Sequence, residues 1–161
     1  TGVIDFPHDW TKMLDLTKEL NPEFIATIND VVPYQFLLPA APYVSKGNTT
    51  IDINFLQEKK EYLQSLCDVL IIEGAGGLMV PIEKDFFMID LIKLFNCETF
   101  LITPSKLGCI NDTLLSINIL KEKNIDFEFY INLYQDIESF EKVSKPFLID
   151  YFKKLNFLQD F

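Results

Sequence analysis

Residues 68–77, Asp-Val-Leu-Ile-Ile-Glu-Gly-Ala-Gly-Gly, constrain the fold more than any other stretch of this 161-residue chain. Residues 69–72 are all aliphatic and do not alternate with polar residues. An unbroken aliphatic run of this length is typical of a central strand in a parallel sheet, which is buried on both faces. The pattern therefore predicts a buried strand over residues 68–73 that carries the carboxylate of Glu73 to its carboxyl end.

Helical and extended patterns alternate along the rest of the chain. The spacing of apolar residues predicts helices over residues 9–20, 50–66, 88–95, 110–123 and 137–155. Further strands are expected over residues 99–103 and 127–133, an extended segment over 31–38 and a stiff Pro-Ala-Ala-Pro connection over 39–42. This order predicts a single α/β domain over residues 1–161, with a mainly parallel sheet flanked by helices. Ligands of such sheets bind at the carboxyl ends of the strands.

The composition excludes several classes of protein. The net charge is −10, and all of the basic residues are lysines, so a nucleic-acid partner is not expected. No apolar stretch reaches the roughly 18 residues that span a bilayer, and no signal peptide opens the sequence, so we expect no membrane partner. The three cysteines, an odd number without a Cys-x-x-Cys pair, fit a reducing cytoplasm.

Glu73 and the glycines after it are the first candidate site. A carboxylate that follows an apolar strand can hold Mg²⁺ on a bound phosphate. Gly76 and Gly77 would let the backbone approach a ligand closely, because they have no Cβ. A dinucleotide-binding Gly-x-Gly-x-x-Gly pattern fails here, since residue 79 is Met. An exposed glycine-rich turn is the alternative interpretation.

The loop of residues 104–113, Pro-Ser-Lys-Leu-Gly-Cys-Ile-Asn-Asp-Thr, is the second candidate site. It leaves one expected strand and opens the next helix, and free N–H groups at a helix start favour an anion. Gly108 permits close approach and Asn111 adds a side-chain amide. The alternative is an ordinary connection in which Asn or Asp caps the helix.

Two further residues have polar side chains at expected element ends. Asp9 can be a helix cap or a second metal carboxylate. Asn132, near the end of the expected strand 127–133, can read an adenine edge or can be a turn residue. His8 is the only histidine, and no Gly-x-Ser-x-Gly pattern accompanies it, so a Ser-His-Asp triad is not expected.

Taken together, the motifs resemble those of the dethiobiotin synthetase family. The resemblance rests on EGAGGLMVP (73–81) followed by PSKLGCINDTLLS (104–116). Thr1-Gly2 is similar to the end of the family's Lys-Pro-x-x-(Ser/Thr)-Gly segment, and Ile131-Asn132 to its adenine-side Asn. Residues 39–43 are similar to its Pro-x-Ser-Pro-His stretch, with Ala and Tyr in place of Ser and His. The last 28 residues match only loosely.

This resemblance implies a P-loop NTPase-like fold and a ligase of biotin biosynthesis. ATP, CO2 and 7,8-diaminononanoate would be its substrates, Mg²⁺ its metal, and a cytoplasmic homodimer its assembly. Glu73 would be catalytic and would bind the metal together with Asp9. Gly76 and Gly77 would lie near the diamine and the phosphates, and Asn132 at the adenine. The residues implied in substrate binding, in part across the dimer interface, are Thr1, Leu107, Gly108, Cys109 and Asn111.

One departure from the family is large. The sequence contains no Gly-x-x-x-x-Gly-Lys-(Ser/Thr), and the family's second catalytic lysine, just before Thr1, is also absent. We therefore expect an N-terminal extension, on the order of a βαβ unit of about 30 or more residues, beyond the printed sequence. Without its strand, the neighbouring strands would expose apolar faces.

Two alternatives stay open from the sequence. One is another P-loop ATPase, of the ParA/MinD type or an amidoligase of cobyric acid synthesis. The other is a degenerate, non-catalytic dimer partner. The Leu-Gly-x-Ile-Asn motif of residues 107–111 is not expected in those ATPases.

Overall fold

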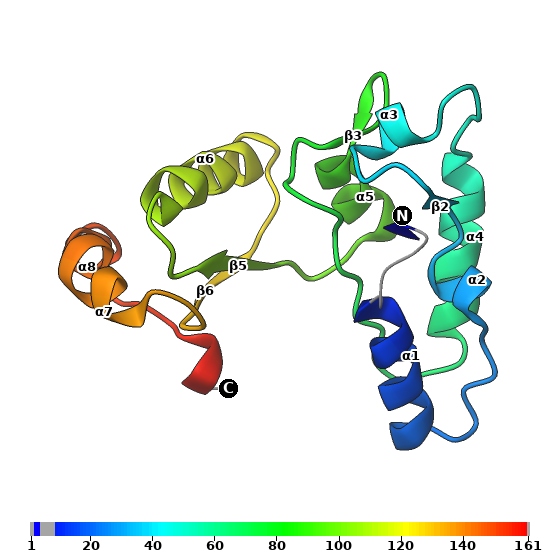
Figure 1. The fold of residues 1–161 in the computed structure, drawn as a ribbon, viewed down its shortest axis with the longest axis horizontal. Coiled ribbons are helices and arrows are strands. Elements are labelled where there is room, and N and C mark those ends of the chain that lie inside the picture. Colours follow the sequence, from blue (N-terminus) through cyan, green and yellow to red (C-terminus); the bar gives the residue numbers. More distant parts are fainter. Residues whose placement is uncertain (1, 4–8, 161) are drawn as a thin grey trace. The chain divides into compact units, whose positions relative to one another are not determined.

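The computed structural model describes the backbone of residues 2–3 and 9–160, and side chains from Trp10 to Asp160. Its contacts fall into two compact units, Thr1–Phe95 and Asn96–Phe161, which we describe in turn (Figure 1). Both units combine helices with a pair of parallel strands, so the chain is α/β as expected. Organisation as a single domain stays a prediction. Among the described helices, none has the length and apolar character required to cross a membrane.

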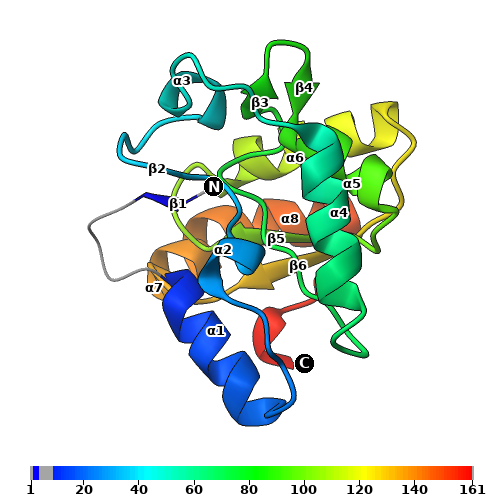
Figure 2. The same ribbon diagram turned by 90° about the vertical axis from the view of Figure 1, so that its right-hand side faces the viewer.

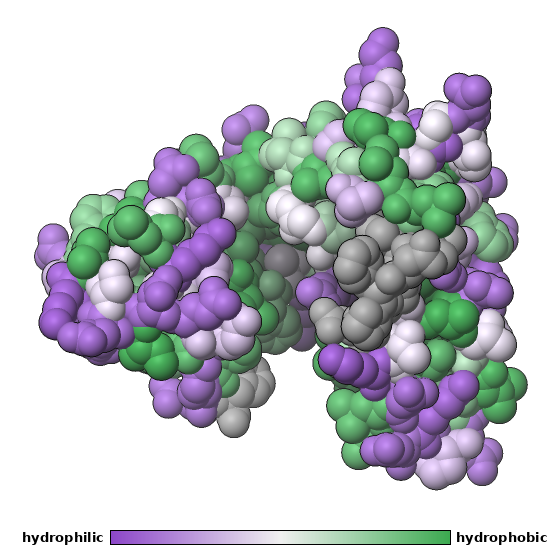
Figure 3. Space-filling model, in the orientation of Figure 1, coloured by the Kyte–Doolittle hydropathy of each residue, from purple (hydrophilic) through white to green (hydrophobic). Residues whose placement is uncertain are grey.

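Three helices form the core of the first unit. Helix α1 spans Asp9–Leu20, as predicted, and α4 spans Ile53–Gln64, within the predicted range. The short helix α2 (Ile28–Val31) contacts both of them (Figure 2). The buried side chains of this core are those of Leu14 on α1, Leu63 on α4, and Phe24 and Ala26 in the connection between α1 and α2. The outer face of α1 keeps apolar side chains at the surface, visible as hydrophobic patches among hydrophilic ones in Figure 3.

Local hydrogen bonds set the starts of α2 and α4. Asp52 accepts from the backbone N–H groups of Asn54 and Phe55, so α4 begins at residue 53 and not at residue 50. Thr27 and Asp30 form a capping box at α2, a helix that the sequence analysis did not predict. The same Asp30 carboxylate lies 2.7 Å from the Lys59 Nζ of α4, which holds the two helices together.

The strands of the first unit are short. Strand β1 (Gly2–Val3) pairs in parallel with β2 (Gln35–Phe36), so only the middle of the expected extended segment 31–38 is a strand. Strands β3 (Pro81–Glu83) and β4 (Phe86–Phe87) form an antiparallel hairpin. Helix α3 (Pro42–Ser45) follows the stiff connection, with Pro42 in its first turn. Helix α5 (Met88–Phe95) has the predicted bounds.

The predicted central strand over residues 68–73 is wrong for this structure. These residues have no regular secondary structure, and Val69 and Ile71 are 76% and 82% exposed. A parallel strand needs a hydrogen-bonded neighbour on at least one side, and none of the described strands pairs with this segment. Aliphatic composition alone therefore did not make these residues a buried strand.

The second unit is built around two parallel strands. Strand β5 (Phe100–Pro104) pairs with β6 (Glu128–Asn132), in a register that sets Phe100 opposite Glu128 and Pro104 opposite Asn132. Helix α6 (Cys109–Glu122) follows β5 and packs against it (Figure 1). These elements confirm the predicted order of strand, helix and strand, with a shift of one residue at each end.

The C-terminal third of this unit is mostly helical, as predicted. Helix α7 (Ile137–Ser139) continues through the π-helical turn η1 (Phe140–Ser144) into α8 (Lys145–Phe152), and the 3-10 turn η2 (Leu158–Asp160) ends the described chain. The core of the unit is formed by the buried side chains of Cys109, Ile131, Phe140 and Leu148.

Candidate functional site

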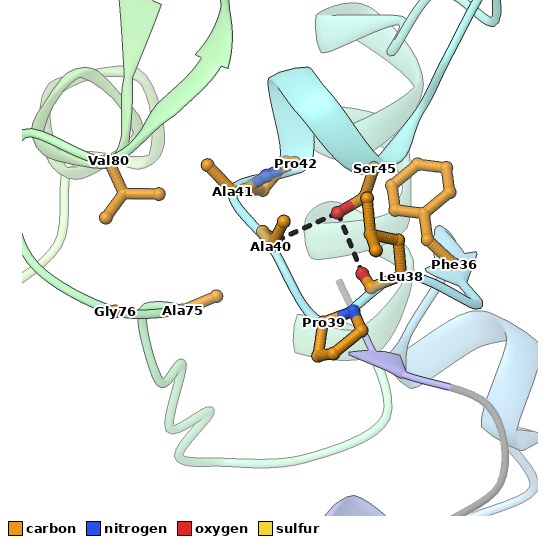
Figure 4. A pocket seen from close by; sticks show the side chains of 10 residues that line it. All are labelled: Phe36, Leu38, Pro39, Ala40, Ala41, Pro42, Ser45, Ala75, Gly76 and Val80. Carbon is orange, nitrogen blue, oxygen red and sulfur yellow. Dashed lines mark hydrogen bonds between the residues drawn. The ribbon is translucent and has the colours of Figure 1, made fainter.

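A cavity of about 320 Å³ lies in the first unit, next to one of the predicted site glycines (Figure 4). One wall is formed by the segment from Phe36 to Ser45, including the Pro-Ala-Ala-Pro stretch, and the other by Ala75, Gly76 and Val80. The structure thus brings together two of the motifs on which the family resemblance rests. Its lining is mostly apolar, which suits the aliphatic part of a ligand.

Hydrogen bonds and proline geometry hold the first wall. The Ser45 hydroxyl oxygen lies 2.9 Å from the carbonyl oxygens of both Leu38 and Ala40, so it fastens the start of the stretch to α3. Pro39 and Pro42 fix the backbone φ on either side of Ala40. The backbone conformation of this wall is therefore fixed by local contacts and does not depend on a bound ligand.

The opposite wall depends on Gly76 for a local reason. Its φ is +78°, and a Cβ at this position would lie 2.9 Å from Val80 Cγ2. Residues with a side chain rarely adopt that backbone conformation. A Cβ on Gly77, by contrast, would meet no atom within 4 Å. Gly76 is thus required by the turn itself, whereas Gly77 leaves open space beside the backbone.

Glu83 and Lys46, which the sequence analysis did not single out, connect the two sides of the cavity. Glu83 lies on β3, three residues after Val80, and its Oε1 accepts from the Ile51 N–H at 2.8 Å. Its Oε2 lies 3.0 Å from Lys46 Nζ, which follows α3 directly and also donates to the Thr49 carbonyl. The hydrogen bond from Ile51, and then Lys46, hold the pKa of the Glu83 carboxyl below its ordinary value. No periodic pattern relates residues 46 and 83, so the sequence carried no signal for this pair.

Glu73 is exposed and precedes Gly74 in an irregular segment rather than at a strand end. Among the described residues, its carboxylate has no hydrogen-bond or ion-pair partner. No group of three or more His, Cys, Asp or Glu side chains gathers anywhere in the described part of the chain. Mg²⁺, however, is commonly held by one or two carboxylates together with substrate phosphates and water. A single free carboxylate beside open glycine backbone therefore fits a metal that arrives with a nucleotide.

The predicted loop in the second unit opens α6 through Gly108. This residue has φ +92° and stands at the N-cap, where no side chain caps the helix, so the alternative interpretation, in which Asn or Asp caps the helix, is not what the structure shows. Asn111 is exposed and donates to the Asp112 carboxylate at 3.3 Å. Leu107 is 75% exposed, whereas Cys109 is fully buried. The Cys109 N–H donates to the Lys106 carbonyl at 3.2 Å, so Leu107 and Gly108, rather than Cys109, form the exposed surface of this loop.

Asn132 ends β6, as predicted, but its side chain already has a partner. Its Oδ1 accepts from Gln159 Nε2 at 2.9 Å, and Gln159 Oε1 accepts from the Leu133 N–H at 3.2 Å. Gln159 lies 27 residues away on η2, and no sequence pattern pointed to it.

Some predicted site positions stay predictions. Thr1 and His8 lie outside the described residues, as does the side chain of Asp9, whose backbone begins α1. Glu73 and Gly76 belong to the first unit, and Gly108 and Asn132 to the second. That these residues share one rim of a sheet stays a prediction.

Comparisons with known proteins give a consistent result. A family model described as an AAA domain matches residues 15–131. The chain is 50% identical over 148 residues to a protein of Sulfurovum sp. named ATP-dependent dethiobiotin synthetase BioD, covering 91% of this chain and 70% of that protein. A protein of the same name from Wolinella succinogenes is 34% identical over 150 residues, covering 91% of this chain and 69% of that protein.

A third relative matches a shorter part of the chain. The protein of this name from Methanocaldococcus jannaschii is 34% identical over 122 residues, or 71% of this chain and 57% of its own length. The family model's range, residues 15–131, includes the glycine-rich segment and the loop that opens α6. The chain belongs to the family of ATP-dependent dethiobiotin synthetases.

Proposed function

We propose that this protein closes the ureido ring of dethiobiotin, using 7,8-diaminononanoate, CO2 and ATP. The observation that carries the proposal is the 50% identity to a dethiobiotin synthetase over 91% of the chain. The apolar cavity beside Gly76 supports it, because the substrate is largely an aliphatic chain.

The reaction has three balanced steps. One amine of the diamine adds to CO2 and loses a proton, which gives a carbamate. A carbamate oxygen then takes the γ-phosphoryl group of ATP, and ADP leaves. The second amine attacks the carbamoyl carbon, the ring closes, and phosphate is released.

Residues of the first unit would serve the nucleotide and the reacting end of the diamine. Glu73 would hold Mg²⁺, with Asp9 as a second carboxylate, and the metal would neutralise charge on the transferring phosphoryl group. The backbone at Gly76 and Gly77 would pass close to the phosphates and the diamine, where Gly77 leaves open space.

Residues of the second unit would serve the two distal ends of the substrates. The exposed residues Leu107 and Gly108, beside the buried Cys109, and the amide of Asn111 would bind the substrate carboxylate, within a homodimer interface. Asn132 would contact the adenine base, and Thr1 would face the diamine. We expect the protein to act in the cytoplasm.

The test is formation of dethiobiotin by the full-length protein, followed by mass spectrometry together with phosphate release. We expect Glu73→Gln to lower kcat by about 100-fold or more, because a neutral amide holds the metal poorly in the same space. Glu58→Gln, which removes an exposed carboxylate from α4, is the matched control and should leave turnover unchanged.

Three results would count against the proposal. Unaltered turnover of Glu73→Gln would remove the metal role of that residue. Absence of diamine-dependent phosphate release in the unmodified protein would instead favour another ATPase activity. Lack of any nucleotide hydrolysis would favour a non-catalytic role.

A further inference from the structure

A short chain of hydrogen bonds sets the orientation of the Asn132 side chain. The Leu133 backbone N–H can only donate, so the atom of Gln159 that faces it at 3.2 Å must be the amide oxygen. The other end of the same amide, Nε2, then points to Asn132 and lies 2.9 Å from its Oδ1. Because Nε2 can only donate, Asn132 must present its oxygen to Gln159.

Gln159 is held in place by the backbone around it. The residues just before it run beside β6, where the Ile131 N–H donates to the Asn156 carbonyl at 2.9 Å and Ile131 forms a parallel bridge with Phe157. The Asn156 side chain adds a bond to the Phe129 carbonyl at 3.2 Å. Gln159 is therefore presented from a fixed segment and not from a loose tail.

The consequence is that Asn132 offers a hydrogen-bond donor to its surroundings. Its oxygen faces Gln159, and no described residue accepts from its Nδ2. An unoriented carboxamide can turn to match either a donor or an acceptor on a ligand. The hydrogen bond to Gln159 largely prevents the Asn132 amide from turning in this way, although the second lone pair of Oδ1 still permits a weaker contact with a donor.

We propose that Gln159 is a positioning residue that decides which group Asn132 offers to the base of the nucleotide. This inference rests on the proposed function, in which Asn132 lies at the base. The donor that Asn132 presents complements acceptors such as a purine ring nitrogen or a 6-carbonyl, and it complements a 6-amino group poorly. The side chain at residue 159, which need not touch the nucleotide itself, then sets part of the base preference.

The pair of ATP and ITP isolates this effect. The two nucleotides carry the same phosphates and ribose, but position 6 of the base is an amino group in ATP and a carbonyl in ITP. The ratio of KM for ITP to KM for ATP therefore cancels changes in phosphate binding and in overall charge.

Gln159→Glu reverses the hydrogen bonding with little change in shape. The ionised carboxylate can still accept from the Leu133 N–H, but it cannot donate, so Asn132 must turn its NH2 toward residue 159 and its oxygen outward. We expect the ITP-to-ATP ratio of KM values to rise by about fivefold or more, the discrimination expected of one hydrogen bond. Gln159→Met frees the Asn132 amide without adding charge and should raise the ratio in the same direction by less. Both variants are assayed in the full-length protein.

Two controls separate orientation from other effects. Gln135→Glu places the same charge on an exposed residue whose side chain bonds to the Tyr134 hydroxyl and not to Asn132, and its ratio should match the unmodified protein. In an Asn132→Ala background, Gln159→Glu should no longer change the ratio.

The outcomes distinguish this inference from the function on which it rests. A ratio that stays within twofold of the unmodified value in both residue-159 variants, while dethiobiotin is still formed, overturns the role of Gln159 alone. A shift that persists after Asn132→Ala also overturns it. Failure of the unmodified protein to make dethiobiotin with either nucleotide overturns the proposed function instead.

Discussion

Replacing Glu83 by Gln removes the ion pair that connects the two sides of the cavity. Gln can still accept from the Ile51 N–H, so the change isolates the contact with Lys46. Fully exposed ion pairs contribute about 0–1 kcal/mol, and breaking a fully buried pair costs about 3–5 kcal/mol. The Glu83 and Lys46 side chains are 24% and 11% exposed, which is intermediate. We therefore expect Glu83→Gln to lower the free energy of unfolding of the first unit by about 1–2 kcal/mol.

Urea denaturation followed by tryptophan fluorescence measures this effect, because Trp10 is the only tryptophan and lies on α1 of the first unit. Lys46→Met removes the other partner, and the double variant gives the coupling energy, expected to be about 1 kcal/mol. Glu58→Gln, on the same unit, serves as the control with no ion pair to lose.

The pH dependence of unfolding gives an independent check that the Glu83 carboxylate stabilises the folded state. The pKa of Glu83 is lowered in the folded state, so its stabilising contribution is present above the ordinary Glu pKa and is lost as the pH falls through the lowered value. The difference in the free energy of unfolding between the unmodified protein and Glu83→Gln should thus be largest near neutral pH and should decrease in acid. A coupling energy below about 0.3 kcal/mol at neutral pH would refute the argument that this pair holds the cavity.

Three further predictions concern the fold around these sites. Gly76→Ala should destabilise the protein by about 1–2 kcal/mol because of its positive φ and its close contact, whereas Gly77→Ala should be nearly neutral, as thermal unfolding would show. Asp30→Asn should lose the ion pair with Lys59 while keeping an acceptor for the helix start. The bonds to Lys59 and Thr27 lower the Asp30 pKa. The loss of stability caused by Asp30→Asn should therefore be about 1 kcal/mol near pH 7 and should disappear in strong acid. Urea denaturation at both pH values measures it. Leu120→Ala removes a fully buried side chain from α6 and should lower the free energy of unfolding by about 2–5 kcal/mol. Denaturation followed by circular dichroism measures this loss. A smaller loss would mean that neighbouring side chains fill the space that Leu120 leaves.

The sequence by itself determined the features that depend on near neighbours in the chain. Helices α1 and α5 have the predicted bounds, and α6 differs by one residue at each end. Helical hydrogen bonds join residues four apart, so the spacing of apolar residues within one segment is enough to predict them. The position of Gly108 just before α6 followed from the sequence in the same way, because it depends on the local turn.

Only the tertiary structure decided the features that join distant segments. Residues 68–73 have the composition of a buried strand, yet strand structure requires a partner from elsewhere in the chain, and composition cannot supply one. The contacts of Glu83 with Lys46 and of Gln159 with Asn132 link residues with no shared period. Such contacts form only when folding brings two segments to hydrogen-bonding distance, and for that reason the sequence supplied the candidate residues but not the partners that orient them.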